Sequence, residues 1–355
     1  MSADTHKEMA GLDDAVSRAV GLLAKARLPL IAGLGTDVDG VRAALRLAHA
    51  VGGAVDHAAA AHVAVDLRVA ADAGNMTTTA AEARNRADLL VIAGPGAAAF
   101  VERSGLFTVA ETPYSWRGER QVLAIGCEIP RAISATAETL AIEGDVRSIL
   151  RRLKARAGGR PAAADAAIEA AAAMLKAAKF GVVVADPEDF DRFGLELLHA
   201  LVKELNETTR FSTLTLPAPH HGRGANLVSA WTTGARLRVG FGRGYPEQDD
   251  WRFDAERLAR SGEVDALVWI GALGPDLPDW AADLATVALV PAGTSTKADV
   301  VIEVGVPGVD HDAVMTDVVR DGLSFVEASA PSSAPRVDAV IARIADALAS
   351  RSGGE

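Results

Sequence analysis

Three histidines, His62, His220 and His221, are the residues best suited to hold a metal ion, because imidazole is a ligand for zinc and other first-row metals. No two of them have the i, i+4 spacing that places metal ligands on one face of a helix. The sequence therefore favours histidines that are exposed or hydrogen-bonded within loops, with a metal site as the less favoured alternative.

Two glycines, Gly33 and Gly35, follow the apolar run 28–32 and precede a helical pattern. Backbone N–H groups of such a turn can bind an anion. A dinucleotide fingerprint needs a third glycine, and Gly40 comes two residues too late for it. Asp37 would also repel a pyrophosphate, so we predict a tight strand-to-helix turn.

A nucleophile is not indicated. No Gly-x-Ser-x-Gly elbow marks a reactive serine. Cys127, the one cysteine, ends an apolar strand and is predicted to be a buried, inert thiol. A single cysteine forms neither an intramolecular disulfide nor a cysteine-ligated cluster, which suits a reducing cytoplasm.

The composition limits the possible partners. The chain has 355 residues and a net charge of −11, which argues against binding to nucleic acid or to an anionic membrane surface. The polar N-terminus has no signal-peptide pattern, and no apolar run is as long as a membrane span. We expect a cytoplasmic protein.

Apolar strands alternate with amphipathic helices along most of the chain, a pattern typical of parallel sheets covered on both faces. Right-handed crossovers then predict an α/β fold of two Rossmann-like, doubly wound units with mainly parallel sheets. Residues 264–271 repeat the pattern of 87–94, which leaves open whether the two units arose by duplication. The strands are expected at 28–32, 89–93, 121–125, 140–142, 180–185, 264–271, 287–290 and 298–302.

Several motifs carry a resemblance in their order and spacing: Asp56, then 224–226 (Gly-Ala-Asn), 231–234 (Trp-Thr-Thr-Gly), 241–246 (Phe-Gly-Arg-Gly-Tyr-Pro) and 320–322 (Arg-Asp-Gly). From about residue 28 to 323 the chain resembles the B subunits of formylmethanofuran dehydrogenases, a branch of the molybdopterin oxidoreductases. The resemblance implies a fold like the central domains of that superfamily. Its domain map here is an N-terminal helix at 1–27, a discontinuous Rossmann-like domain of 28–62 and 180–330, an inserted Rossmann-like domain at 63–179, and a C-terminal helix and tail at 331–355.

The chain departs from that family at the metal. The family's tract after Asp56 ends in a cysteine that ligates molybdenum or tungsten, whereas this tract has no cysteine and His62 stands near that position. The family's active-site arginine would fall at Pro217. The resemblance therefore implies no molybdopterin, no iron-sulfur cluster, no metal and no catalytic residue, with a vestigial site made by His62, Pro217, His220, His221 and Arg223.

This combination is similar to the B subunits of formyltransferase/hydrolase complexes of methylotrophic bacteria. The resemblance implies a non-catalytic, metal-free scaffold in one-carbon metabolism. Its partners would be the A, C and D subunits of the complex, of which A is amidohydrolase-like and D is formyltransferase-like. Together these convert formyl-tetrahydromethanopterin to formate through a methanofuran-like carrier. An active molybdenum or tungsten dehydrogenase and a free-standing nucleotide-binding enzyme remain alternatives. Because aromatic and arginine side chains are enriched in interfaces, we expect partner contacts at Trp231, Phe241, Arg243, Tyr245 and Trp251.

Overall fold

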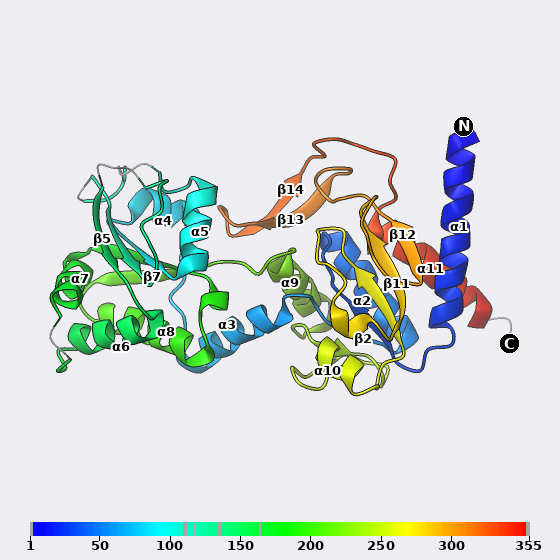
Figure 1. Cartoon of the computed structure of the whole chain (residues 1–355), viewed down its shortest axis with the longest axis horizontal. Coiled ribbons are helices and arrows are strands. Elements are labelled where there is room, and N and C mark those ends of the chain that lie inside the picture. The colour runs from blue at the N-terminus through cyan, green and yellow to red at the C-terminus, as the bar shows by residue number, and fades with distance from the viewer. Residues whose placement is uncertain (1–2, 109–111, 117, 134–136, 163–164, 353–355) are drawn as a thin grey trace. The chain divides into compact units, whose positions relative to one another are not determined.

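The computed structural model describes the backbone of residues 3–108, 112–116, 118–133, 137–162 and 165–352 (Figure 1). The chain divides into two compact units. Unit 1 comprises Met1–Ala60, Ala218–Thr316 and Leu323–Glu355, and unit 2 comprises Ala61–Pro217 and Asp317–Gly322. The expected domain map needs correction, since the insertion ends at residue 217 and not at 179. The terminal helices α1 (Ala3–Leu23) and α11 (Val337–Ser352) belong to unit 1.

Unit 1 is built on a seven-stranded sheet with the order β12-β11-β10-β1-β2-β8-β9. Five of the strands are parallel, in the doubly wound order 2-1-3-4-5, while β8 and β9 add an antiparallel edge. The strands are β1 (Pro29–Ala32), β2 (Ala54–Val55), β8 (Val239–Gly240), β9 (Glu247–Gln248), β10 (Ala266–Ile270), β11 (Ala285–Val290) and β12 (Val300–Glu303).

Helices cover the unit 1 sheet unequally. Helices α1, α2 (Val38–Val51), α9 (Gly222–Thr233) and α11 pack on one face and form the larger core (Figure 1). Among the described residues, the other face carries only α10 (Ala255–Arg260) and the 3₁₀ turn η2 (Asp279–Ala281), around the buried ring of Trp269. A hairpin of β13 (Ala313–Asp317) and β14 (Gly322–Val326) follows β12.

Unit 2 is built on a five-stranded, fully parallel sheet with the order β5-β4-β3-β6-β7. Helices α4 (Ala80–Arg86) and α5 (Pro95–Ser104) pack on one face, and α6 (Val146–Ala157), α7 (Ala166–Ala177) and α8 (Arg192–Leu205) on the other. Helix α3 (Ala60–Ala73) leads into this unit and the 3₁₀ turn η1 (Pro187–Asp189) follows β6. The strands are β3 (Leu89–Ala93), β4 (Gln121–Ile125), β5 (Glu138–Ile142), β6 (Phe180–Ala185) and β7 (Arg210–Thr215).

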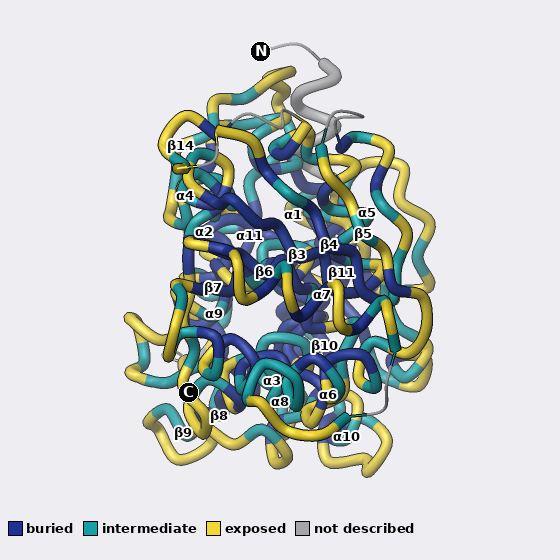
Figure 2. Tube along the Cα trace, turned by 90° about the vertical axis from the view of Figure 1, so that its left-hand side faces the viewer, coloured by how far each residue is buried: buried dark blue, intermediate teal, exposed yellow. Residues whose placement is uncertain are grey.

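The predicted fold class is therefore confirmed: both units are α/β, with mainly parallel sheets whose central strands are buried (Figure 2). The two stretches that repeat one another, β3 and β10, each pair in parallel with the next strand of their own unit. The similarity extends further: β4 and β5 follow β3 across the sheet as β11 and β12 follow β10, and β6 and β7 lie on the other side of β3 as β1 and β2 lie on the other side of β10. Within the described residues no helix is long and apolar enough to cross a membrane.

Candidate functional site

The loops after β1 and β10 meet where the strand order of unit 1 reverses, the position at which doubly wound sheets usually bind ligands. A Cβ atom on Gly33 would lie 2.6 Å from the Ile270 carbonyl oxygen, so the glycine permits close packing of the two loops. The Gly35 N–H donates to the same oxygen at 2.9 Å, and the Leu273 N–H donates to the Gly35 carbonyl at 2.7 Å. Asp37 caps α2 by accepting the Gly40 N–H at 3.0 Å. The predicted tight turn is confirmed.

Two histidines predicted as site residues, His220 and His221, hold these loops together. His220 Nδ1 lies 2.9 Å from the Leu273 carbonyl oxygen, so this nitrogen carries a proton and donates. His221 Nδ1 donates to the Thr36 carbonyl at 2.7 Å, while its Nε2 accepts the Thr316 N–H at 3.0 Å. Burial lowers the pKa of His221. Both of its nitrogens are bonded to backbone groups, which leaves no lone pair for a metal.

A third histidine, His57, completes the arrangement. Its Nδ1 accepts the Ala59 N–H at 2.9 Å, so the proton is on Nε2, which donates to the His220 carbonyl at 3.1 Å. Burial lowers the pKa of His57 to about 4. The side chain is therefore neutral and acts as a fixed cross-link between the segment after β2 and the loop before α9.

Asp56 precedes this histidine, and its buried carboxylate forms an ion pair with Arg238. Its carboxylate accepts the His57 N–H at 2.8 Å and the Ala255 N–H at 2.9 Å, and it lies 3.2 Å from Arg238 Nε. Burial raises the pKa of Asp56 to about 6, and the Arg238 charge opposes this rise. Arg238 also contacts Asp254 at 2.6 Å, so the group joins β8 to the start of α10.

The other predicted site residues lie elsewhere. His62 is in the first turn of α3 and Pro217 follows β7, both in unit 2. Arg223 is exposed in the first turn of α9. The structure thus brings His220 and His221 together with His57, which was not among the predicted site residues, and it places His62 in the other unit.

The donor set does not fit a molybdenum or tungsten cofactor. A soft thiolate is the expected protein ligand, and Cys127 is the chain's one thiol. It lies in unit 2, where its Sγ is 3.6 Å from the Ile92 carbonyl oxygen. Burial raises the pKa of this thiol, which keeps it protonated.

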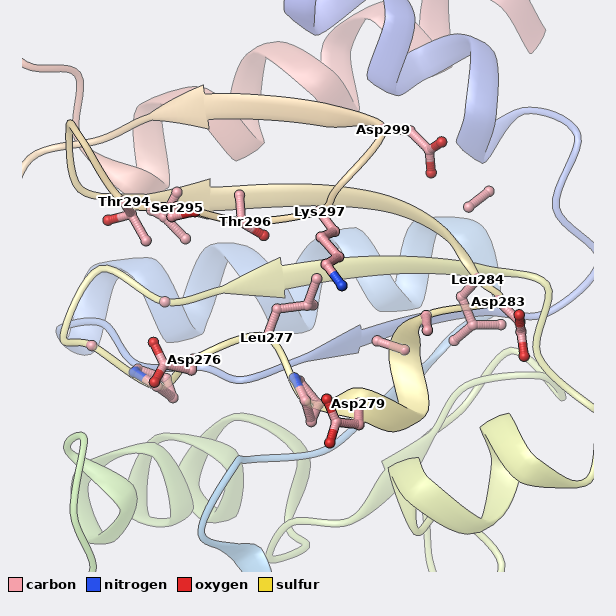
Figure 3. A pocket seen from close by; sticks show the side chains of 18 of the residues that line it. Asp276, Leu277, Asp279, Asp283, Leu284, Thr294, Ser295, Thr296, Lys297 and Asp299 are labelled. Carbon is pink, nitrogen blue, oxygen red and sulfur yellow. The ribbon is translucent and has the colours of Figure 1, made fainter.

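A cavity of about 760 Å³ opens on the thinly covered face of the unit 1 sheet, between η2 and the loop 291–299 (Figure 3). Its charged lining consists of one lysine and four aspartates: Lys297, Asp276, Asp279, Asp283 and Asp299. This excess of negative charge disfavours the phosphates of a nucleotide.

The predicted interface residues divide into two groups. Trp231, Tyr245 and Trp251 are exposed, Trp251 by 72%, and the Arg243 side chain is exposed beside Glu247. Phe241 was predicted wrongly, since it is only 4% exposed and packs against His49 with ring centroids 5.3 Å apart. A ring in that position is part of the core and cannot contact a partner.

Known proteins are similar to this chain in sequence and in fold. No protein-family model matches the chain. It is 38% identical over 361 aligned residues to the B subunit of the formyltransferase/hydrolase complex Fhc of Methylorubrum extorquens, with 98% of each chain covered. This chain belongs to the family of formyltransferase/hydrolase complex B subunits. The predicted resemblance is confirmed.

Two further similarities agree with this family. The crystal structure of the formyltransferase/hydrolase complex FhcABCD of Methylorubrum extorquens with methylofuran contains a chain that matches with a TM-score of 0.88 and 37% identity, covering 96% of this chain and 97% of that one. The B subunit of the tungsten-containing formylmethanofuran dehydrogenase 2 of Methanocaldococcus jannaschii is 24% identical over 328 residues, 84% of this chain and 74% of that one. The relationship to the dehydrogenase B subunits is thus also confirmed.

Proposed function

We propose that this chain is the non-catalytic scaffold, the B subunit, of a cytoplasmic formyltransferase/hydrolase complex. In this proposal the amidohydrolase-like A and formyltransferase-like D subunits convert formyl-tetrahydromethanopterin to formate through a methanofuran-like carrier, while the C subunit completes the assembly. Support comes from the matching chain in a complex that binds methylofuran, and from the B subunit that is 38% identical.

The observation that carries the non-catalytic role is the hydrogen bonding of the histidines at the switch point. His57 and His221 are neutral, and all four of their ring nitrogens bond to backbone groups. A general acid or base needs a nitrogen that can exchange a proton with substrate, and a metal ligand needs a free lone pair. These two side chains offer neither, so their role is to hold the loops.

The two alternative functions are less well supported. A molybdenum or tungsten dehydrogenase would need a thiolate, and Cys127 is a protonated thiol away from the aligned tract. A nucleotide-binding enzyme would need a positive or neutral crevice, whereas the unit 1 cavity is lined by four aspartates and one lysine.

We place one partner contact at Trp231, which lies beside a groove of about 300 Å³ between α2 and α9. Val38, Arg42, Arg46 and Thr232 line the same groove. An exposed tryptophan next to two arginines is a typical centre of a protein interface, and the arginines favour an acidic partner surface.

The test is recovery of the tagged chain from its native host, followed by identification of the associated subunits and elemental analysis. We expect the A, C and D subunits in fixed ratio with the chain, and no stoichiometric molybdenum, tungsten or iron. Recovery of the chain as a monodisperse monomer would contradict the assembly. About one molybdenum or tungsten per chain would contradict the non-redox role.

A further inference from the structure

The side chain of His62 is buried in unit 2 without a hydrogen-bond partner. It is 5% exposed, and within the described residues neither ring nitrogen makes a hydrogen bond. Two carboxylates nevertheless lie next to it. Nδ1 is 3.1 Å from Glu188 Oε1, and Nε2 is 3.7 Å from Asp186 Oδ1.

The position of these carboxylates in the fold matters as much as their distance. They follow β6, and the strand order of unit 2 reverses between β3 and β6, so they lie at the carboxyl edge of the sheet where ligands bind in doubly wound folds. Gly96 makes room for Asp186, because a Cβ atom at Gly96 would lie 2.7 Å from Asp186 Oδ2.

The charges around His62 are unbalanced. In the part of the chain that the structure describes, no arginine or lysine forms an ion pair with Asp186, Glu188 or the adjacent Asp189. The Asp189 carboxylate already accepts a hydrogen bond from the Gly96 N–H at 2.8 Å, at the start of α5. A cation at this place would relieve the repulsion between the carboxylates.

The spacing of His62 and Glu188 fits that of two ligands of one ion. Their atoms are within contact distance but do not form a hydrogen bond, so the oxygen lies off the N–H direction. Metal ligands point at the ion and not at each other. Two donors about 2.1 Å from a tetrahedral zinc ion lie roughly 3.4 Å apart.

We propose that His62, Asp186 and Glu188 form a binding site for a divalent first-row metal ion, with zinc as the favoured occupant. One ligand atom from each residue already lies within 4.8 Å of the others. An ion would draw the farthest atom inward by about 1.4 Å. The Glu188 side chain is 60% exposed and has room for that movement.

Imidazole and carboxylate are ligands of zinc, and zinc binds more tightly to such sites than manganese or iron does. The ion would join the start of α3 to the turn after β6. This site would revise the expectation of a metal-free chain. It would not supply the redox chemistry of the dehydrogenases, because zinc does not change oxidation state.

The test is metal binding by the full-length chain, or by its complex if it is obtained as one, purified without chelators and then stripped with EDTA. Zinc is titrated back and counted by elemental analysis, and cobalt(II) is used as a visible probe of the ligands. We expect one ion per chain, at least a tenfold loss of affinity in Glu188→Gln and loss of binding in His62→Ala. Glu188 is on the surface, so its variant stays folded even if His62→Ala does not.

Matched controls come from the same unit. His199 is a second buried histidine whose ring nitrogens have no hydrogen-bond partner among the described residues, and no carboxylate forms an ion pair with it there. Glu196 is a surface carboxylate paired with Arg192. His199→Gln and Glu196→Gln should bind zinc like the unchanged chain. Equal affinity of the unchanged chain and Glu188→Gln for zinc, cobalt and manganese would overturn the proposal, as would no binding of any of the three.

Discussion

The buried, neutral state of His57 makes the stability of unit 1 depend on pH in a direction that can be calculated. The ordinary pKa of a histidine is 6.5, and burial lowers that of His57 to about 4. Between these values the unfolded chain binds a proton that the folded chain does not, so the free energy of unfolding falls as the pH falls. The contribution is fully present above about pH 6.5, and the loss is roughly 3.4 kcal/mol at the acidic limit.

The perturbation is His57→Asn. The asparagine amide oxygen can still accept the Ala59 N–H, but this side chain does not titrate and is too short to donate to the His220 carbonyl. Loss of that hydrogen bond should cost about 1 kcal/mol at pH 7. By pH 4.5 the unchanged chain should have lost about 2 to 3 kcal/mol that the variant retains. The variant is thus expected to be the less stable protein at pH 7 and the more stable one at pH 4.5.

The assay is urea unfolding between pH 7 and 4.5, followed by tryptophan fluorescence, to which the buried Trp269 of the same unit contributes. Because Asp56 also titrates in this range, the variant His57→Asn and the unchanged chain must be compared at each pH. The pKa of Asp56 is raised to about 6, so it makes the folded state relatively more stable as the pH falls, opposite to His57. Both proteins contain Asp56, and their difference therefore reports His57.

Val55→Ala is the control. This residue is buried next to Asp56 and His57, and its substitution removes no titratable group. It should destabilise the protein by a similar amount at every pH. The reasoning is refuted if the difference between His57→Asn and the unchanged chain stays constant to within about 0.5 kcal/mol over this range.

Three other variants test which side chains belong to the surface and which to the core. The double variant Trp231→Ala and Trp251→Ala should fold normally yet recover less of the partner subunits in a pull-down, by tenfold or more, and unchanged recovery would remove these side chains from the interface. Phe241→Ala should instead lower the free energy of unfolding by about 3–5 kcal/mol in denaturant titration, because the ring is in the core. Arg223→Ala should leave the rate of formate release by the assembled complex within about tenfold, and a larger loss with assembly intact would mean that this chain takes part in the chemistry.

Sequence patterns were sufficient for the fold class because most strands of the parallel sheets are short apolar runs, such as β3 and β6, and they alternate with helices that have an apolar face. They were not sufficient for the domain boundary. The run at 180–185 has the same pattern whichever sheet it joins, and only its parallel pairing with β3 places it in unit 2. That pairing joins segments about ninety residues apart, and hydrophobic periodicity contains no information about such contacts.

The candidate site was predictable only in part, because its contacts also join segments that are far apart in the sequence. The tract from Asp56 to His62 was visible as a motif, but the two histidines in it have unrelated partners. His57 bonds to a carbonyl 163 residues away, which no local pattern indicates. The carboxylates beside His62 did leave a signal, because an Asp-Pro-Glu-Asp run directly after a predicted parallel strand marks the edge where ligands bind. Phe241 was misjudged because an aromatic residue in a long irregular segment looks the same whether it faces solvent or core.

The hydrogen bonds at the switch point of unit 1 pair the polar groups of its loops with one another. Loops at this position usually direct backbone groups toward a bound cofactor, and unpaired groups would be costly once buried. Here the carbonyls of Thr36, Leu273 and His220 accept bonds from the three histidines, while Gly35 and Ile270 pair across the two loops. These polar groups are paired within the chain, which in the proposed scaffold role would keep the loops rigid and leave the surfaces of the chain to contact the partner subunits.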